Sequence, residues 1–399
     1  MRKLKQFIEK IVEFLLMLSG TATTVIIVLI ILFLFKEGFG LFKNPSVEKG
    51  FTICLHTDNP INSLSSYDIK EIFDTEITNW EEVGGVNSEI KVFRFNELFD
   101  LYTPEEFGDD YQLLPEKLGE VISNNKNIIA YLPQQYMPKT ANAKILETKN
   151  IGITDFFLKK EWIPTSSPTP QFGVLPLLLG TLYVSIIAIL IALPLGLGVA
   201  IYLSELAGNR TRKILKPIIE LLAGIPSVVY GFFGLVVLVP LLQSWFNLPV
   251  GETALAGSII LAIMALPTII TVAEDSIRNT PRYIREASLA LGATKWQTIY
   301  KVVIPYAKSG ISAAVVLGIG RAIGETMAVL MVTGNAALMP LSIFEPIRTI
   351  PATIAAELGE APVGGAHYQA LFLLGCMLFV ITLFISVAAE LISKRHKTH

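Results

Sequence analysis

The chain has 399 residues, of which 52% are hydrophobic and only 17% are charged, and its net charge is −2. A soluble domain is typically about 25% charged, so this composition excludes an ordinary soluble enzyme and a disordered chain. The small negative charge gives no field that would attract a nucleic acid. The 2 cysteines and 4 histidines are scattered, so they predict neither a disulfide framework nor a metal site.

Long uncharged stretches recur along the chain, and a bilayer-spanning helix needs about 20 apolar residues. We predict six transmembrane helices, at residues 12–36, 174–203, 217–245, 253–273, 310–334 and 368–391. The first stretch could instead be a signal peptide. Its apolar part is longer than such a peptide needs, and no small-residue cleavage site follows it. We therefore expect a membrane anchor.

Lysine and arginine residues predict the orientation, because short cytoplasmic loops are enriched in them. They gather before the first predicted span and after the second, fourth and sixth spans. We therefore expect both chain ends in the cytoplasm and a domain of residues 40–170 outside the membrane. The predicted organisation is an anchor at 1–39, this external domain, and a five-helix core at 171–399.

The loop after the fourth predicted span, residues 274–308, contains two short helical patterns around a glycine. Glu286 and Ala287 lie in the first pattern, Gly292 permits a turn, and Pro305 is expected to end the second. A pair of amphipathic helices could dock in a groove of a soluble partner. The alternative is a connector that lies on the membrane surface.

This loop resembles the EAA loop of ABC-importer permeases. Ser288 stands where that family has a second alanine, and Pro305 directly follows an isoleucine where the family often has Leu-Pro. The resemblance implies a type I (MetI-like) permease core. It also implies that Glu286, Ala287, Gly292 and Pro305 mark a coupling contact with an ATPase subunit.

Three further segments are similar to the phosphate-specific (Pst) permeases. They are residues 223–231 (AGIPSVVYG), 265–270 (ALPTII) and 320–331 (GRAIGETMAVLM). The Gly-Glu-Thr-Met version, with residues 171–176, resembles the PstC subunit rather than PstA. The resemblance implies a PstA-like second permease, a PstB-like ATPase dimer, a PstS-like phosphate-binding protein and the plasma membrane of a prokaryote.

The chain has no P-loop sequence. Such a loop is the usual cradle for the phosphates of ATP. We therefore expect no bound cofactor and no enzymatic activity on this chain, with ATP and magnesium used by the partner ATPase.

Two charged residues, Arg321 and Glu325, lie in the fifth predicted span. Their spacing predicts one shared helix face, and each would cost about 2.5–3.5 kcal/mol if it faced lipid. One interpretation is a salt bridge that only stabilises the bundle. The other, which the resemblance favours, is that Arg321 lines the anion path with Glu325 orienting it and Thr326 beside them, because arginine donates two parallel hydrogen bonds to phosphate.

Two glycines and four glutamates in residues 171–399 also allow predictions. Gly320 and Gly324 form a smooth strip for close helix approach, either inside this chain or toward the second permease. Four glutamates outside the predicted spans are expected to be solvated: Glu252, Glu345, Glu357 and Glu360.

The predicted external domain resembles part of a PstS-type phosphate-binding protein. Residues 67–85 carry a helix pattern ending in Ile-Phe and then Ile-Thr-Asn-Trp, and residues 90–94 a strand pattern ending in Arg94. The resemblance implies a small α/β domain like one lobe of such a protein. There the arginine precedes a Gly-Ser-Gly-Thr-type segment that cradles the anion, whereas residues 95–99 here read FNELF.

We therefore expect this domain not to bind phosphate. It would dock the binding protein, cap the external gate or act as a spacer. Residual phosphate binding through Arg94 is the alternative.

The sequence thus predicts an α-helical integral membrane permease subunit of a phosphate ABC importer. The alternative within the class is a permease for another oxyanion, such as sulfate, molybdate or tungstate. A membrane sensor that uses residues 40–170 as its ligand-binding domain is a different class. Only about eight residues follow the last predicted span, which leaves no signalling domain there. A channel would have no use for the coupling loop.

Overall fold

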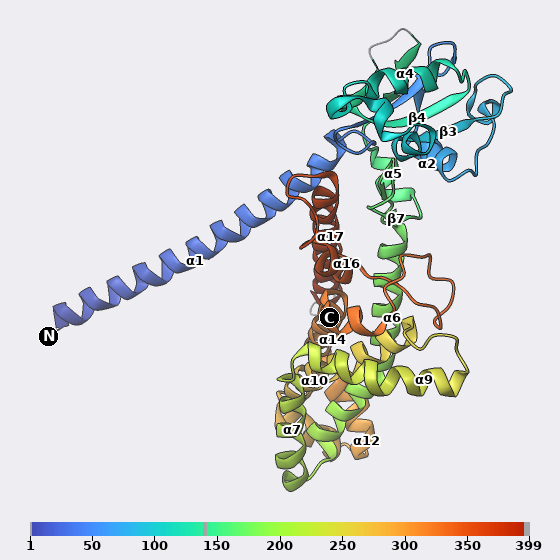
Figure 1. Cartoon of the computed structure of the whole chain (residues 1–399). Helices are drawn as coiled ribbons and strands as arrows, with labels where there is room; N and C mark the ends of the chain where they lie inside the picture. Colours follow the sequence, from blue (N-terminus) through green and yellow to red (C-terminus); the bar gives the residue numbers. More distant parts are fainter. Residues whose placement is uncertain (1, 139–141, 395–399) are drawn as a thin grey trace. The chain divides into compact units, whose positions relative to one another are not determined.

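The computed structural model describes residues 2–138 and 142–394, and the chain divides into two compact units (Figure 1). The first unit comprises Met1–Gly38 and Val174–His399, and its described part is mainly helical. The second unit comprises Phe39–Gly173 and mixes strands with short helices. The second unit thus covers nearly the same residues as the expected domain 40–170.

The first unit contains the segments that can cross a membrane. Among the described residues, five are long and apolar enough: Lys10–Lys43, Leu175–Leu206, Ser227–Phe246, Ala254–Arg278 and Ala366–Ala388. Lys295–Tyr306 and Lys308–Gly324 form a sixth if this pair, bent by 71°, is one span. The predicted α-helical membrane fold is therefore confirmed, and a count of six spans requires the bent pair.

The helices of this unit have the following bounds. The long helices are α1 (Arg2–Phe39), α6 (Leu175–Ile201), α10 (Ala254–Arg278), α14 (Lys308–Gly324) and α17 (Ala366–Lys394). The shorter ones are α7 (Asn209–Ala223), α8 (Ser227–Phe233), α9 (Val239–Phe246), α11 (Arg282–Ala290), α12 (Lys295–Thr298), α13 (Ile304–Tyr306), α15 (Met327–Val332) and α16 (Ile350–Glu357). Turns of π-helix lie at Tyr202–Leu206, Gly234–Leu238 and Ile299–Val303.

The third predicted span, 217–245, is wrong at its start. Helix α7 ends at Ala223, and α8 begins only at Ser227. Pro226 is the N-cap of α8 and has an extended ψ of 142°. Because proline lacks the N–H that a continuous helix would use, the chain bends at this point instead of continuing as one rod.

The fifth predicted span, 310–334, is not one helix. Helix α14 ends at Gly324, and Glu325 has an extended backbone with φ −71° and ψ 135°. The next helix, α15, starts at Met327. Glycine is a weak helix former, so a helix ends there at little cost when the following segment packs elsewhere.

Helices α6, α10 and α14 pack closely because small residues line their contacts. Ile269 of α10 fills the space that side chains at Gly196 of α6 and Gly318 of α14 would need, since a Cβ at either glycine would lie 2.8 Å from it. Ser276 of α10 likewise leaves no room for a side chain at Gly310 of α14. The three helices therefore form one packed body.

Helix α1 contacts α17 through its C-terminal part. The ring of Phe33 lies 5.6 Å from that of Phe372, and the ring of Phe35 lies 6.4 Å from that of Phe379, both edge to face. Before this contact α1 exposes large apolar side chains, such as Leu16 at 68%. A helix that is apolar on all sides is stable in a lipid environment, as expected of a membrane anchor.

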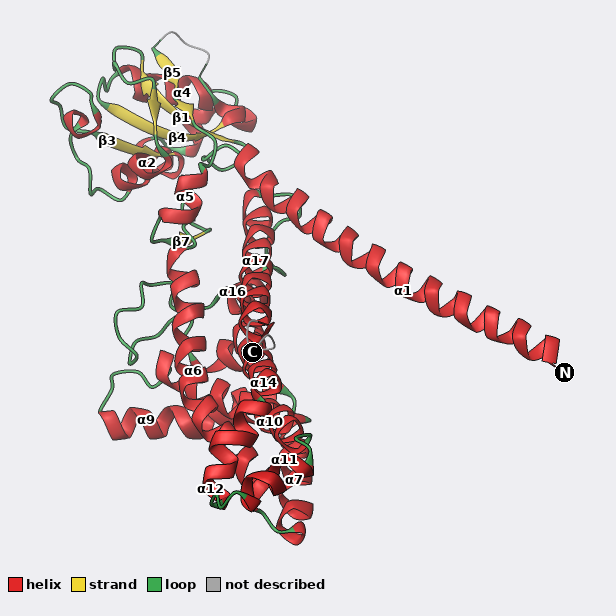
Figure 2. Ribbon diagram, turned by 180° about the vertical axis from the view of Figure 1, so that it is seen from behind, coloured by secondary structure: helices red, strands yellow, loops and turns green. Residues whose placement is uncertain are grey.

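The second unit is built on a sheet with the strand order β3-β4-β1-β5, which Figure 2 shows in yellow. The strands are β1 (Phe51–His56), β3 (Lys91–Arg94), β4 (Ile128–Pro133) and β5 (Ala143–Ile145). Strand β1 is antiparallel to β4 and β5, and β3 is parallel to β4. The remaining elements are β2 (Ser63–Leu64), β6 (Glu147–Thr148), β7 (Trp162–Ile163), β8 (Gln171–Phe172), α2 (Ser66–Phe73), α3 (Leu98–Leu101), α4 (Leu114–Ser123) and α5 (Ile153–Leu158).

Alternating side chains of this sheet build a core on each of its faces. Ile129 and Tyr131 of β4 pack with α2, whereas Ile128 and Ala130 pack with α4. Successive strand residues point to opposite faces, so both faces are covered. Helix α2 begins at a capping box formed by Ser65 and by Asp68, the third residue of the helix. The result is a small α/β unit with a helix on either side of its sheet.

Candidate functional site

The loop expected to couple to an ATPase is a helix, a turn and a second helical segment. Gly292 has φ +84°, a left-handed conformation that glycine adopts without strain. Thr294 caps α12 in a capping box with Gln297. Pro305 lies in α13, one residue before the helix Lys295–Tyr306 ends, and the bend follows at Ala307. The π-helical turn Ile299–Val303 precedes it, so the regular hydrogen-bond pattern is already interrupted where the proline lacks its N–H.

One face of this loop exposes apolar side chains. Leu291 is 90% exposed, Tyr283 70% and Trp296 60%. Glu286 and Ala287 are exposed on α11 as well. An exposed apolar patch of this kind, rimmed by polar groups, is typical of a surface that meets a partner protein or a membrane.

The opposite face of the loop makes contacts within the loop and with the helical core. The hydroxyls of Ser288 and Thr298 lie 3.0 Å apart and join α11 to the second helical segment. Ile299 and Val303 are buried. The serine that departs from the family pattern thus makes a hydrogen bond that an alanine could not make.

Three ion pairs beside this loop, formed by two carboxylates, were not singled out from the sequence. Arg285 of α11 pairs with Glu205 at 2.8 Å. Glu274 of α10 is 1% exposed, and it accepts from Arg212 at 2.6 Å and from Lys216 at 2.7 Å. From the sequence alone, the basic residues indicated only the orientation. The signal for these ion pairs was that Glu205 and Glu274 stand just after two predicted spans, close to basic residues.

Arg321 and Glu325 do not share a helix face. Arg321 lies in the last turn of α14, and its guanidinium donates to the Thr268 hydroxyl of α10 at 3.2 Å. Glu325 lies beyond the helix end, and no ion pair joins it to Arg321 in the part of the chain that the structure describes. The salt-bridge interpretation is therefore wrong. The Thr326 hydroxyl donates to the Gly324 carbonyl at 3.3 Å.

Thr268 is a residue that the sequence analysis did not single out, although it lies in the quoted segment 265–270. Its hydroxyl holds one nitrogen of Arg321. The described hydrogen-bond partner of the arginine is thus a hydroxyl group and not a carboxylate.

Among the described residues, none packs against the glycine strip of α14. A Cβ added at Gly320 or at Gly324 would meet nothing within 4 Å. Ala313, Leu317, Gly320 and Gly324 are all exposed and follow one another at helical spacing. The interpretation of internal packing is wrong for these two glycines, whereas Gly318 does pack internally against Ile269.

Glu357, which the sequence analysis expected to be solvated, is instead in an ionic cluster. Its side chain is 15% exposed and pairs with Arg348 at 2.6 Å and with His367 at 2.9 Å. Arg348 also donates to the Asn335 carbonyl. The cluster joins α16 to the start of α17 and to the segment before α16.

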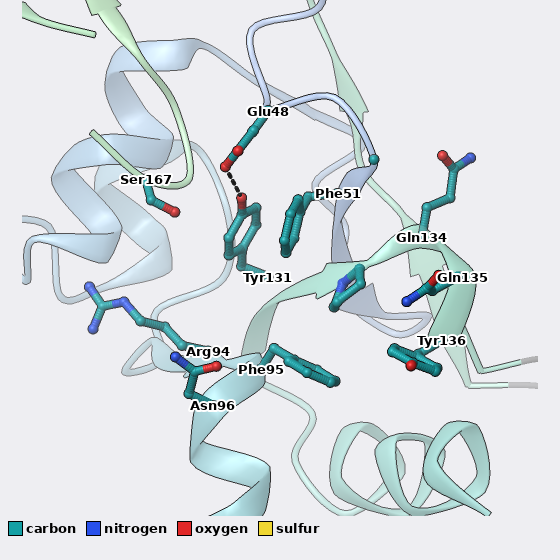
Figure 3. Close-up of a pocket in the computed structure, with 12 residues that line it drawn as sticks. Glu48, Phe51, Arg94, Phe95, Asn96, Tyr131, Gln134, Gln135, Tyr136 and Ser167 are labelled. Atoms are coloured by element: carbon teal, nitrogen blue, oxygen red, sulfur yellow. Dashed lines mark hydrogen bonds between the residues drawn. The ribbon is translucent and has the colours of Figure 1, made fainter. Parts of the chain in front are cut away.

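The second unit has a pocket of about 860 Å³ at the end of β3 and β4 (Figure 3). Arg94 is on its rim, but its guanidinium donates to the Phe73 carbonyl at 2.6 Å and lies 5.7 Å from the centre of the Phe73 ring. Phe95 stacks on Tyr136 at 5.7 Å, at the position where the resemblance implied a glycine. These aromatic rings line the pocket and leave no backbone cradle of the expected kind.

A carboxylate faces the same pocket. Tyr131 donates to Glu48 at 3.0 Å and stacks on Phe51 at 4.7 Å. Burial, and then the hydrogen bond to Glu48, raise the pKa of Tyr131, so its hydroxyl stays protonated and donates. An anion in this pocket would meet the carboxylate of Glu48.

The family model described as binding-protein-dependent transport system inner membrane component matches residues 192–398. The chain is 43% identical over 243 residues to the probable ABC transporter permease protein YqgH of Bacillus subtilis, covering 61% of this chain and 78% of that protein. It is 42% identical over 254 residues to the phosphate transport system permease protein PstC of Mesorhizobium japonicum, covering 59% and 76%. For PstC of Haemophilus influenzae the identity is 37% over 263 residues, covering 61% and 82%.

Two solved structures are similar to separate parts of the chain. The inward-facing MetNI methionine ABC transporter is 18% identical over 54% of this chain and 93% of its own, with a TM-score of 0.44. A phosphate ABC transporter substrate-binding protein with bound phosphate, from Clostridium perfringens, is 25% identical over 24% of this chain and 43% of its own, with a TM-score of 0.17.

Proposed function

The chain belongs to the family of binding-protein-dependent transport system inner membrane components, and we propose that it is the permease subunit that passes inorganic phosphate through an ABC importer. The assignment of phosphate as the substrate rests on the 37–42% identity to phosphate permeases, over 76% and 82% of their lengths. Like those relatives, the chain is a permease subunit and not an enzyme. ATP hydrolysis belongs to partner subunits.

We propose that the exposed face of α11 and α12 is the contact with a PstB-like ATPase. The apolar side chains on this face have no cover among the described residues, while the opposite face is bonded to the core. Glu286 is exposed beside them and can pair with a cation of the ATPase. A rigid helix pair with one exposed apolar face can dock in a groove of a soluble partner.

We propose that Arg321 contacts the transported anion. Its described hydrogen bond uses one nitrogen, toward Thr268, so the rest of the guanidinium fork remains for phosphate. An unpaired cation in a membrane-spanning helix faces protein or a polar cavity rather than lipid. Thr268 therefore takes the orienting role that the sequence analysis assigned to Glu325, while Glu325 and Thr326 lie in the break next to it.

The strip of α14 that includes Leu317, Gly320 and Gly324 is the proposed contact with a PstA-like second permease. It is exposed along a helix whose other side is packed against α6 and α10. Helices approach closely in a membrane where small residues lie on their surfaces. A partner on this face would also bring Arg321, on the same helix, close to the boundary between the two permeases.

For the second unit we propose a docking role without phosphate binding, outside the membrane, with both chain ends in the cytoplasm. Arg94 is engaged by Phe73, Phe95 replaces the expected glycine, and Glu48 adds a negative charge. The partner would be a PstS-like binding protein that brings phosphate to the permease. A permease for sulfate, molybdate or tungstate remains the alternative within the class.

The proposal is tested by co-expressing the chain with its partner permease and ATPase. We expect the three to purify together and the ATPase rate to rise when a phosphate-loaded binding protein is added. A rise with sulfate- or tungstate-loaded protein, and none with the phosphate-loaded one, would exclude phosphate. Failure of the ATPase to purify with the chain would exclude the importer.

A further inference from the structure

One arginine of the coupling loop touches the ends of two membrane-spanning segments at once. Arg285 lies on α11, and the same nitrogen pairs with Glu205 at 2.8 Å and donates to the Ile277 carbonyl at 2.9 Å. Glu205 is in the π-helical turn that continues α6, and Ile277 is in the last turns of α10. The guanidinium is therefore the point where three elements meet.

The contact is sheltered from solvent. The side chain of Glu205 is 11% exposed and that of Arg285 is 22% exposed, while Ile277 is fully buried. The hydroxyl of Ser204 gives Glu205 a further hydrogen bond at 3.2 Å. A pair held in this way is more than a surface ion pair, because loss of one partner leaves the other charge without compensation.

The elements on the core side of this contact are packed against one another. An apolar cluster joins the ends of α6 and α10 to α14, and it includes Ala200, Ile277 and Ala314. Glu274, one turn before Ile277, fastens α7 to the same end of α10 through Arg212 and Lys216. A displacement of α11 would thus reach α6 and α10 directly at Arg285, and α7 through α10.

We infer that Arg285 and Glu205 are positioning residues that transmit the movement of the coupling loop to α6 and α10. The inference rests on the proposed function, since it assigns a role within an importer driven by an ATPase. It is distinct from the ATPase contact itself, because Arg285 points toward the core and the apolar contact face of the loop points away from it. The expected defect is therefore loss of coupling in complexes that still assemble.

The test measures phosphate taken up per ATP hydrolysed in reconstituted complexes of equal subunit composition. Arg285→Gln and Glu205→Gln should each lower this ratio about ten-fold, which corresponds to an interaction of about 1.4 kcal/mol. The matched control is Arg210→Gln on α7, which removes the same charge at an exposed position outside the coupling loop. The control should keep the ratio of the unaltered complex.

The reversed pair Glu205→Arg with Arg285→Glu should recover part of the ratio, because the ion pair is restored. A role in folding alone predicts fewer assembled complexes but a normal ratio in those that form, and that result would overturn the inference. A normal ratio in Arg285→Gln would also overturn it. Absence of phosphate uptake by the unaltered complex would instead refute the proposed function.

Discussion

At the scale of single residues, Arg321 has an open guanidinium in a segment where charge is costly. Its described partner is the Thr268 hydroxyl, and Glu325 is separated from it by the end of α14. A hydroxyl orients a guanidinium without neutralising it. The arrangement therefore suits a group that binds an anion briefly and releases it, as transport requires.

We predict that Arg321→Gln leaves the complex assembled but removes most phosphate uptake. Arg321→Lys should recover only part, because an ammonium is a point charge without the two-pronged geometry of arginine. Glu325→Gln should act independently: in a double-mutant cycle on uptake its coupling to Arg321 should stay below about 0.5 kcal/mol. Normal uptake by Arg321→Gln would remove this residue from the anion path, and strong coupling would restore the salt bridge.

Glu274 is predicted to be a stability residue. Glu274→Gln should lower the free energy of unfolding by about 3 kcal/mol, because it leaves Arg212 and Lys216 without their buried carboxylate. The readout is thermal unfolding of the purified complex. Asp275→Asn is the control, since this neighbouring carboxylate is 55% exposed and pairs with Lys216 at the surface. Equal effects of the two changes would contradict the assignment.

The sequence could single out Arg321 but not its partner. A spacing of four residues predicts a shared face only if the helix continues, and here it ends at Gly324. Glu274 was missed for a related reason. A linear charge pattern does not show which carboxylate is buried against a helix from another part of the chain, as Glu274 is against α7. Gly292, in contrast, could be recognised from its local sequence alone.

At the scale of elements, the coupling loop is stiff because its turn and its caps are local. Gly292 has φ +84°, and a Cβ there would meet nothing within 4 Å. A substitution at this position is therefore opposed by the backbone conformation and not by a clash. This makes the turn a place where coupling can be altered without unfolding the core.

We predict that Gly292→Val uncouples ATP hydrolysis from uptake while the complex still inserts and assembles. A β-branched residue in this conformation costs about 1–3 kcal/mol and shifts the turn. Gly292→Asn is the matched control, because asparagine tolerates the left-handed region and should behave nearly as glycine. The measurement is again uptake per ATP hydrolysed. Wild-type coupling in the valine variant, or loss of the folded protein, would count against the role of this turn.

Apolar length predicted the membrane-spanning segments well, because the bilayer demands it irrespective of tertiary contacts. It could not predict where those segments break. Pro226 interrupts the third span and Gly324 the fifth, and apolar residues stand before and after each break. The small residues of α14 show the same limit: Gly318 packs inward and Gly320 faces open space, although the two are separated by one residue.

At the scale of the whole molecule, a membrane core and an α/β unit are joined in one chain. The α/β character was predicted from the resemblance of residues 67–94 to part of a phosphate-binding protein, which rests on local sequence. The pocket that Arg94 borders could not be predicted, because it depends on Glu48, Tyr131 and Tyr136 from distant segments. The aromatic and acidic lining of this pocket differs from the lining expected of a site that binds inorganic phosphate.

We predict that the second unit, Phe39–Gly173, shows no heat of binding when it is titrated with inorganic phosphate. Arg94 is already bonded to Phe73, and Glu48 opposes an anion. Arg94→Ala should therefore leave the titration unchanged. Circular dichroism of the isolated unit supplies the control for folding. Micromolar phosphate binding that Arg94→Ala abolishes would overturn the docking role.

The central claim is that this chain conducts inorganic phosphate in an importer driven by ATP. The direct measurement is uptake of labelled phosphate into vesicles that contain the full complex, with ATP enclosed and the binding protein outside. We predict uptake that requires ATP, stops with a hydrolysis-deficient ATPase, and is competed by unlabelled phosphate but not by sulfate or tungstate. Uptake without ATP, or uptake competed as well by sulfate or tungstate, would contradict the account.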